Sequence, residues 1–224
     1  NRFDPAALAT TFLYDNTRQS RAFYAFPIRQ QTLHVHYWND MLASAGYTAG
    51  DIPTQWDAYW DFWCTRVQPA YRQNTGSRVH GVGLPMGVDS SESVYVFLAF
   101  MDAYNVKLVD DLGKLQVDDP SVRAGLIKAL ASYTALYAKG CTPPSSTGWQ
   151  DPDNDVAFFN QTTILTPNTT LSIVAKYLDD SDNLALTAEQ RSTARRNATG
   201  QIATSGFPNK PDGTKMVYRA AVKT

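Results

Sequence analysis

The chain has 224 residues, 43% of them hydrophobic, and a formal net charge of -1 at pH 7. This length suffices for one large packed domain or two small ones. The balanced charge, with no basic cluster, argues against a nucleic-acid partner, and no apolar run approaches the roughly 20 residues of a membrane span.

Both ends of the chain look cut. It begins at Asn1 rather than Met, shows no signal peptide, and stops at Thr224 just after a strand-like segment. We therefore expect a processed or truncated piece of a longer protein.

The first clear element is a strand over residues 32–38. Its side chains alternate with a period of two, which predicts a strand with two unlike faces: Thr32, His34 and His36 on one, Leu33, Val35 and Tyr37 on the other. Three polar residues stand where this strand begins, Arg29, Gln30 and Gln31. They form either an ordinary solvated turn or a rim that holds a polar ligand.

A helix is predicted over residues 51–73, with Thr54 as its N-cap. Aromatic residues recur on it at helical spacing, which favours a buried face over a sugar-stacking surface: Trp56, Tyr59, Trp60 and Trp63. Asp57 and Asp61 lie one turn apart on the polar side of this helix, where solvation is their simplest role.

The middle of the chain alternates short strands and helices. Residues 77–87 form a short strand and 88–104 a helix, with Asp89 as a possible N-cap. After a polar ribbon over 105–120, the clearest helix spans 118–140. Asp119 caps this helix, Pro120 occupies its first turn, Gly140 ends it, and one apolar face is formed by Val122, Leu126, Leu130 and Tyr133.

The remaining segments continue the alternation. A loop over 141–155 leads to a buried strand that ends at Asn168, then come helices over 169–180 and 187–197, and two strands around a Pro/Gly turn over 200–222. Alternating strands and helices predict an α/β fold.

Cys64 and Cys141 are the only cysteines. They either form a disulfide in an oxidising compartment or fill space as small buried residues. Without a CxxC spacing, and with three histidines, a zinc site is not expected. His34 and His36 could bind a metal as a pair, but no third ligand is in sight, so ordinary strand histidines are preferred.

Several motifs, each weak alone, occur in an order that resembles the family 1 extracellular solute-binding proteins of ABC importers, the group that includes maltose-binding protein. A strand ends in "YWNDML", and a helix start follows at Pro53-Thr54-Gln55-Trp56-Asp57. Later come the strand "TILTPN", the return "FPNKPDGTKMVYRAAV", and a spaced motif of Trp149, Asp151, Asn154, Ala157 and Phe158. The chain departs from the family at Asn160-Gln161-Thr162-Thr163, where a Gly and an apolar pair are usual.

The resemblance implies a lobe of a type II periplasmic binding protein, with a central mixed sheet flanked by helices. A complete family member is close to twice this length and has two lobes joined by crossing strands. By analogy, residues 1–33 are the tail of the first lobe and the approach to the hinge. Residues 34–218 are most of the second lobe, and residues 219–224 begin the return crossover.

The resemblance also implies ligand-binding positions. The hinge loop that lines the cleft corresponds to Arg29, Gln30 and Gln31, and a helix start facing the cleft corresponds to Asp89, Ser90, Ser91 and Glu92, where free N–H groups would add donors. Trp149 is the candidate exposed aromatic residue, and Asn168, Thr169 and Thr170 open another helix at a ligand contact. Helix capping or loop packing is the alternative at each of these positions.

Two functions are weighed. The first is a periplasmic protein that binds a sugar, a polyol or a similar polar solute and hands it to a membrane permease. The second is a carbohydrate-active hydrolase that uses Asp57 with Asp61, or Asp89 with Glu92, as acid and base. No catalytic or nucleotide-binding motif is present, so we favour the binder, which is not an enzyme and needs no cofactor.

Overall fold

The computed structural model describes residues 3–216 and 221–223. Its helices are α1 Pro5–Ala9, α2 Asn39–Ser44, α3 Trp56–Asp61, α4 Gln68–Thr75, α5 Ser91–Ala103, α6 Pro120–Ala138, α7 Asp153–Phe159, α8 Ser172–Asp182 and α9 Ala188–Arg196. Short 3-10 turns are η1 Ala49–Asp51 and η3 Pro144–Gly148, and π-helical turns are η2 Phe62–Val67 and η4 Asn197–Gln201. The strands are β1 Phe12–Asp15, β2 Ser20–Phe23, β3 Arg29–Gln31, β4 His34–Trp38, β5 His80–Val82, β6 Thr163–Asn168, β7 Ile202–Ser205 and β8 Ala221–Lys223.

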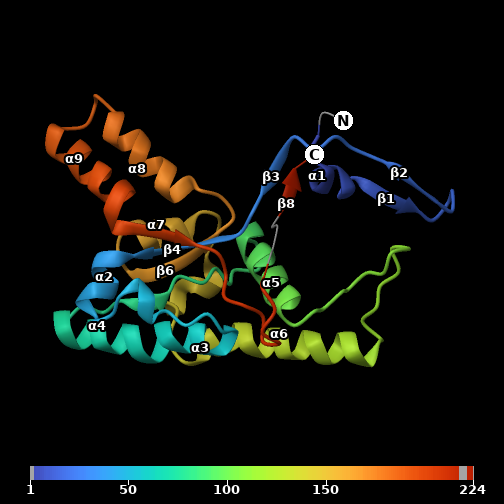
Figure 1. The fold of residues 1–224 in the computed structure, drawn as a ribbon, viewed down its shortest axis with the longest axis horizontal. Helices are drawn as coiled ribbons and strands as arrows, with labels where there is room; N and C mark the ends of the chain where they lie inside the picture. The colour runs from blue at the N-terminus through green and yellow to red at the C-terminus, as the bar shows by residue number, and fades with distance from the viewer. Residues whose placement is uncertain (1–2, 217–220, 224) are drawn as a thin grey trace.

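A four-stranded mixed sheet organises the larger part of the chain. Its strand order is β5-β6-β4-β7, with β5 parallel to β6 and the other two pairs antiparallel. Helices lie on both sides of it, with α8 and α9 on one side and α3, α4 and α6 on the other (Figure 1). The predicted α/β lobe with a flanked mixed sheet is confirmed.

Both faces of β4 are buried, so the prediction of two unlike faces was wrong. Tyr37 packs against Trp63, with ring centroids 5.4 Å apart. From the opposite face, Trp38 stacks on Phe158 at 5.0 Å and donates its indole N–H to that residue's carbonyl. His36 is also fully buried, because helices cover the sheet on either side.

The predicted aromatic helix is one continuous helical run made of α3, η2 and α4. It begins one residue later than predicted, because Gln55 rather than Thr54 is the N-cap residue. The π-helical turn precedes Pro69, whose missing N–H and bulky ring disrupt regular α-helical bonding. The predicted buried face is confirmed, since Trp56, Trp60 and Trp63 are 0–4% exposed.

A disulfide between Cys64 and Cys141 ties this run to the segment after α6, which resolves the two readings of these cysteines. The segment that carries β5 packs closely against both of these parts of the chain. A Cβ at Gly81 would lie 2.4 Å from the Trp63 carbonyl oxygen and 3.2 Å from the Cys141 sulfur, so this position accepts only glycine.

The long helix α6 begins and ends largely as predicted. Asp119 accepts hydrogen bonds from the N–H groups of Ser121 and Val122, and Gly140 adopts a positive φ of 67° after the last turn. Its buried face was predicted correctly at Tyr133, which is 7% exposed, but not at Leu130. Leu130 is 50% exposed, and Ala129 is buried in its place.

Two small sheets lie beside the main one. β1 and β2 form an antiparallel hairpin, and β3 pairs antiparallel with β8. The two strands predicted over 200–222 therefore do not pair with each other, because β7 joins the central sheet. Residues 217–220 of that segment lie outside the described part. None of the helices between residues 3 and 216 combines the length and hydropathy that a membrane crossing needs.

Candidate functional site

The start of α5 is bound by a carboxylate from a distant loop. Asp151 accepts hydrogen bonds from the hydroxyls of Ser90 and Ser91, and from the backbone N–H groups of Ser91 at 3.2 Å and Glu92 at 3.1 Å. Ser90 is the N-cap residue and binds the N–H of Ser93, so the predicted cap at Asp89 is displaced by one residue. The N–H groups expected to face a ligand are therefore already paired.

Close approach of two loops brings Asp151 to this helix. A Cβ at Gly87 would lie 1.9 Å from the carbonyl oxygen of Trp149, two residues before Asp151. Gly87, the last glycine of the stretch "GVGLPMG" (residues 81–87), thus serves packing, because only a residue without a side chain lets these backbones touch.

The C-terminal end of β6 carries a second group of polar side chains. Asn168 is 1% exposed, donates its amide N–H to Asp155 at 2.5 Å, and accepts hydrogen bonds from the N–H and hydroxyl of Thr170. Asp155 also accepts from the hydroxyl of Ser172 at 3.2 Å and the amide of Asn154 at 3.3 Å. Asn168 therefore shapes the turn into α8, as in the capping alternative.

One hydrogen bond joins the two groups. The Thr169 hydroxyl donates to Glu92 Oε1 at 3.3 Å, so α5 and the β6–α8 turn lie together. We call the combined set the polar cluster: Ser90, Ser91, Glu92, Asp151, Asn154, Asp155, Asn168, Thr169, Thr170 and Ser172. Within the described ranges, Glu92 Oε2 and Asn154 Oδ1 are buried acceptors that receive no hydrogen bond.

The acids of this cluster have shifted pKa values, raised by burial and lowered by hydrogen bonds. Burial, with further contributions from Asp155 and Asp151, raises the pKa of Glu92 to about 7. Burial also raises the pKa of Asp155, against hydrogen bonds from Asn168 and Ser172 that oppose the rise. For Asp151, burial would raise the pKa, but the hydroxyl and N–H donors on α5 outweigh it and hold the pKa below its usual value.

Two histidines lie beside the cluster. His34 is directly opposite Asn168 in the β4–β6 register, and His36 Nε2 is 3.5 Å from the Thr170 carbonyl. Burial lowers the pKa of His36 to about 4, so its ring is neutral at pH 7. No group of three or more potential ligands for a metal ion occurs in the described portion of the chain.

Trp149 lies apart from this cluster. The indole of Trp149 is 8% exposed and hydrogen-bonds the hydroxyl of Ser145, so the expectation of an exposed aromatic was wrong. It lines a hollow of about 420 Å³ that also includes His80 and Thr162, at the start of β5 and just before β6. Arg29, Gln30 and Gln31 form β3, but their side chains lie outside what the structure describes.

Of the carboxylates considered for hydrolysis, Glu92 is hydrogen-bonded within the cluster and the others are not part of it. Asp57 and Asp61 line a hollow of about 630 Å³ between α3 and α6, where Asp61 pairs with Lys139 at 3.3 Å. Asp89 is exposed just before the α5 cap, while Glu92 binds Thr169.

Sequence reasoning missed the roles of three residues in this region. Asp151 and Asn154 were noted only as parts of a family motif, and Asp155 was not singled out. They belong to the start of α7 and the loop before it, a segment predicted to be loop up to residue 155. The "DPDND" pattern, acidic residues after a proline, was the available signal for a helix start.

The bacterial extracellular solute-binding protein family matches this chain over residues 2–210. The chain belongs to that family. No curated protein is significantly similar to it in sequence.

Solved structures of solute-binding proteins share the fold. Maltose-bound MalE3 of T. maritima has 21% identity and a TM-score of 0.63, with 95% of this chain and 46% of that one covered. MalE of Xanthomonas citri has 18% identity and a TM-score of 0.60, covering 97% and 46%. A binding protein of Agrobacterium vitis with bound D-mannitol has 18% identity and a TM-score of 0.57, covering 98% and 49%. The chain thus spans about half the length of these structures.

Proposed function

We propose that this chain is part of the solute-binding component of an ABC importer, which binds a sugar, a polyol or a similar polar solute and delivers it to a membrane permease. The observation that carries this proposal is the polar cluster. It gathers hydroxyls, amides and carboxylates from α5, the loop before α7 and the end of β6. Such groups suit a solute rich in hydroxyls.

We further propose the division of the chain that the family resemblance implies. Residues 34–218 form most of one lobe around the four-stranded sheet, and residues 1–33 and 219–224 lead to the other lobe. The pairing of β3 with β8 supports this division, because it places two chain segments side by side outside the main sheet (Figure 1). The solute then lies between the lobes, and the polar cluster contributes one side of the site.

We propose binding without catalysis, because several of the carboxylates are held by other groups of the protein. Asp151 and Asp155 each accept several hydrogen bonds from the protein, and Asp61 is paired with Lys139. A hydrolase needs one carboxylic acid and one carboxylate facing each other across the substrate. The family supports a transport role in the periplasm or outside the cell.

Removal of one hydroxyl tests the site. Thr169→Val keeps the side-chain volume but removes the hydroxyl that binds Glu92. We expect the affinity of the complete protein for its solute to fall by up to about tenfold, because Glu92 loses a hydrogen bond that orients its carboxyl group, and such a bond is worth roughly 0.5–1.5 kcal/mol. Calorimetry with maltose, D-mannitol and related sugars would measure the affinity. Thr134→Val, at an exposed position of α6, should leave it unchanged. Equal affinities for both variants would place the site elsewhere.

A further inference from the structure

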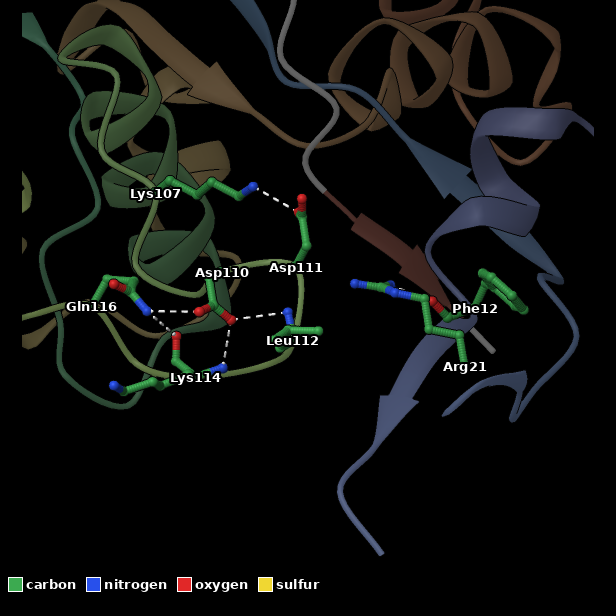
Figure 2. A network of polar contacts seen from close by, with 8 residues as sticks. All are labelled: Phe12, Arg21, Lys107, Asp110, Asp111, Leu112, Lys114 and Gln116. Carbon is green, nitrogen blue, oxygen red and sulfur yellow. Dashed lines mark hydrogen bonds and ion pairs between the residues drawn. The ribbon is translucent and has the colours of Figure 1, made fainter. Parts of the chain in front are cut away.

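The segment between α5 and α6 carries an ordered loop with an apolar surface. We call residues 108–116 the clasp loop. Asp110 organises it by accepting hydrogen bonds from the N–H groups of Leu112 and Lys114, both at 2.9 Å, and from the amide of Gln116. Val109 and Leu115 form an antiparallel bridge at its base, and Figure 2 shows the hydrogen bonds to Asp110. The loop therefore has a defined shape although it projects from the lobe.

Apolar side chains of the clasp loop are left without cover. Val109 is 45% exposed, Leu112 59% and Leu115 58%. An ordered loop that presents three such residues together resembles half of an interface, since scattered single residues need no explanation but a cluster does.

The β1–β2 hairpin presents a second uncovered surface. Phe12 pairs with Phe23 and Tyr14 with Arg21, so these four side chains share one face of the hairpin, which we call the phenyl face. The rings of Phe12 and Phe23 lie 4.8 Å apart, and the residues are 37% and 58% exposed. A two-stranded hairpin by itself is marginally stable in water, so it gains from a partner on this face.

Charge complementarity links the two surfaces. Figure 2 shows the Arg21 side chain reaching from β2 toward the loop tip that carries Asp111 and Leu112. Lys107, which binds Asp111 at 2.7 Å, is the main cause of the lowered pKa of Asp111, and the charge of Arg21 lowers it further. Arg21 itself donates a hydrogen bond to the Phe12 carbonyl, which holds its side chain on the phenyl face.

We propose that the clasp loop and the phenyl face are two halves of one intramolecular contact, in which Leu112 packs on the phenyl rings while Asp111 pairs with Arg21. The contact joins a segment of the main lobe to the N-terminal hairpin. None of its residues belongs to the polar cluster, so a test of this contact is independent of the proposed ligand site.

Disulfide trapping tests this contact. Cysteines replace Tyr14, at the edge of the phenyl face, and Lys114, which keeps the two phenyl rings, Leu112 and the Asp111–Arg21 pair. The native cysteines do not interfere because they are already bridged. The matched control replaces Leu13 and Lys114, because Leu13 lies on the opposite face of β1. We expect an intramolecular bridge to form about tenfold faster in the Tyr14→Cys/Lys114→Cys protein than in the control.

Two further variants separate the apolar from the charged contribution to this contact. In the Tyr14→Cys/Lys114→Cys protein, Leu112→Asn and Arg21→Glu should each slow trapping, and higher salt should slow it as well. Arg18→Glu, in the exposed turn between β1 and β2, should have little effect. Equal trapping rates in the two cysteine pairs, or a cross-linked product of twice the monomer mass, would overturn the proposal. The second result would assign the surfaces to contacts between copies of the chain.

Discussion

Asp151 shows how a single carboxylate can position a helix of which it is not a part. It lies in the loop before α7 but accepts hydrogen bonds from the first residues of α5. A negative charge at a helix N-terminus is favourable both for hydrogen bonding and for the helix dipole. The placement of Glu92 therefore depends on a residue 59 positions away in the sequence.

Replacement of Asp151 by Ala should destabilise the protein by about 0.5–2 kcal/mol at pH 7, the range measured for loss of a helix cap. Because the pKa of Asp151 is lower in the folded protein, its contribution is present above the usual value of 3.8 and disappears as the pH falls through the folded value. Urea denaturation at pH 7 and at pH 3 would measure both effects. Asp118→Ala, at an exposed position before α6, is the control. A variant as stable as the parent at pH 7 would contradict the role of Asp151.

Glu92 should make stability depend on pH in the opposite sense. Its pKa rises from 4.5 to about 7 in the folded protein, mainly through burial. Between these values the unfolded chain releases a proton that the folded protein keeps, so stability falls as the pH rises from 4.5 to 7 and is then constant. Glu92→Gln should remove this loss, on the order of 3 kcal/mol, whereas Glu189→Gln on exposed α9 should not. Parallel pH profiles for the parent and Glu92→Gln would show that Glu92 titrates normally.

The sequence identified part of this site through family resemblance. Glu92, which follows Ser90 and Ser91, accepts a hydrogen bond from Thr169, so two of the segments named from the resemblance lie side by side. Their ligand contacts remain predictions. His34 was missed as a neighbour, because its position opposite Asn168 depends on strand register, which a local pattern does not reveal.

At the scale of elements, hydrophobic periodicity identified the helices well, but it was less accurate about which residues of each helix are buried. The aromatic residues of α3 and η2 are buried as predicted, because several large rings can be covered only by the core. On α6, Leu130 and Ala129 are neighbours, and Ala129 is the one inside because it shares a helix face with buried Tyr133 and Leu136. Helix α7 was missed because it is short and is preceded by a proline-rich loop.

The aromatic helix and α6 provide a matched pair of substitutions. Trp60 is 4% exposed and stacks on Phe100 with ring centroids 5.3 Å apart. Trp60→Ala should cost about 3–5 kcal/mol of unfolding free energy through the cavity it leaves. Leu130→Ala should cost less than about 1 kcal/mol, because Leu130 is half exposed. Chemical denaturation followed by circular dichroism would compare them. Similar costs for both would mean that the two positions are equally buried.

At the scale of the whole molecule, the order of strands and helices was sufficient to predict the α/β class, and the resemblance to a known family implied the type of lobe. Topology was harder, since adjacent segments near the C-terminus pair with different partners: β7 with β4, and β8 with β3. Such long-range pairing depends on how the chain returns across the molecule, and the local sequence contains no signal for it.

The central claim is that the polar cluster is one side of a solute site that binds without catalysis. The most direct measurement is titration calorimetry of maltose, D-mannitol, tagatose and laminaribiose against both the complete protein and this chain alone, followed by analysis of the recovered sugar. We expect the complete protein to bind at least one of them and return it unchanged, and this chain alone to bind it far more weakly, because one side of the site loses about half of the contacts. Equally tight binding by this chain alone, or recovery of a cleaved sugar, would contradict the account.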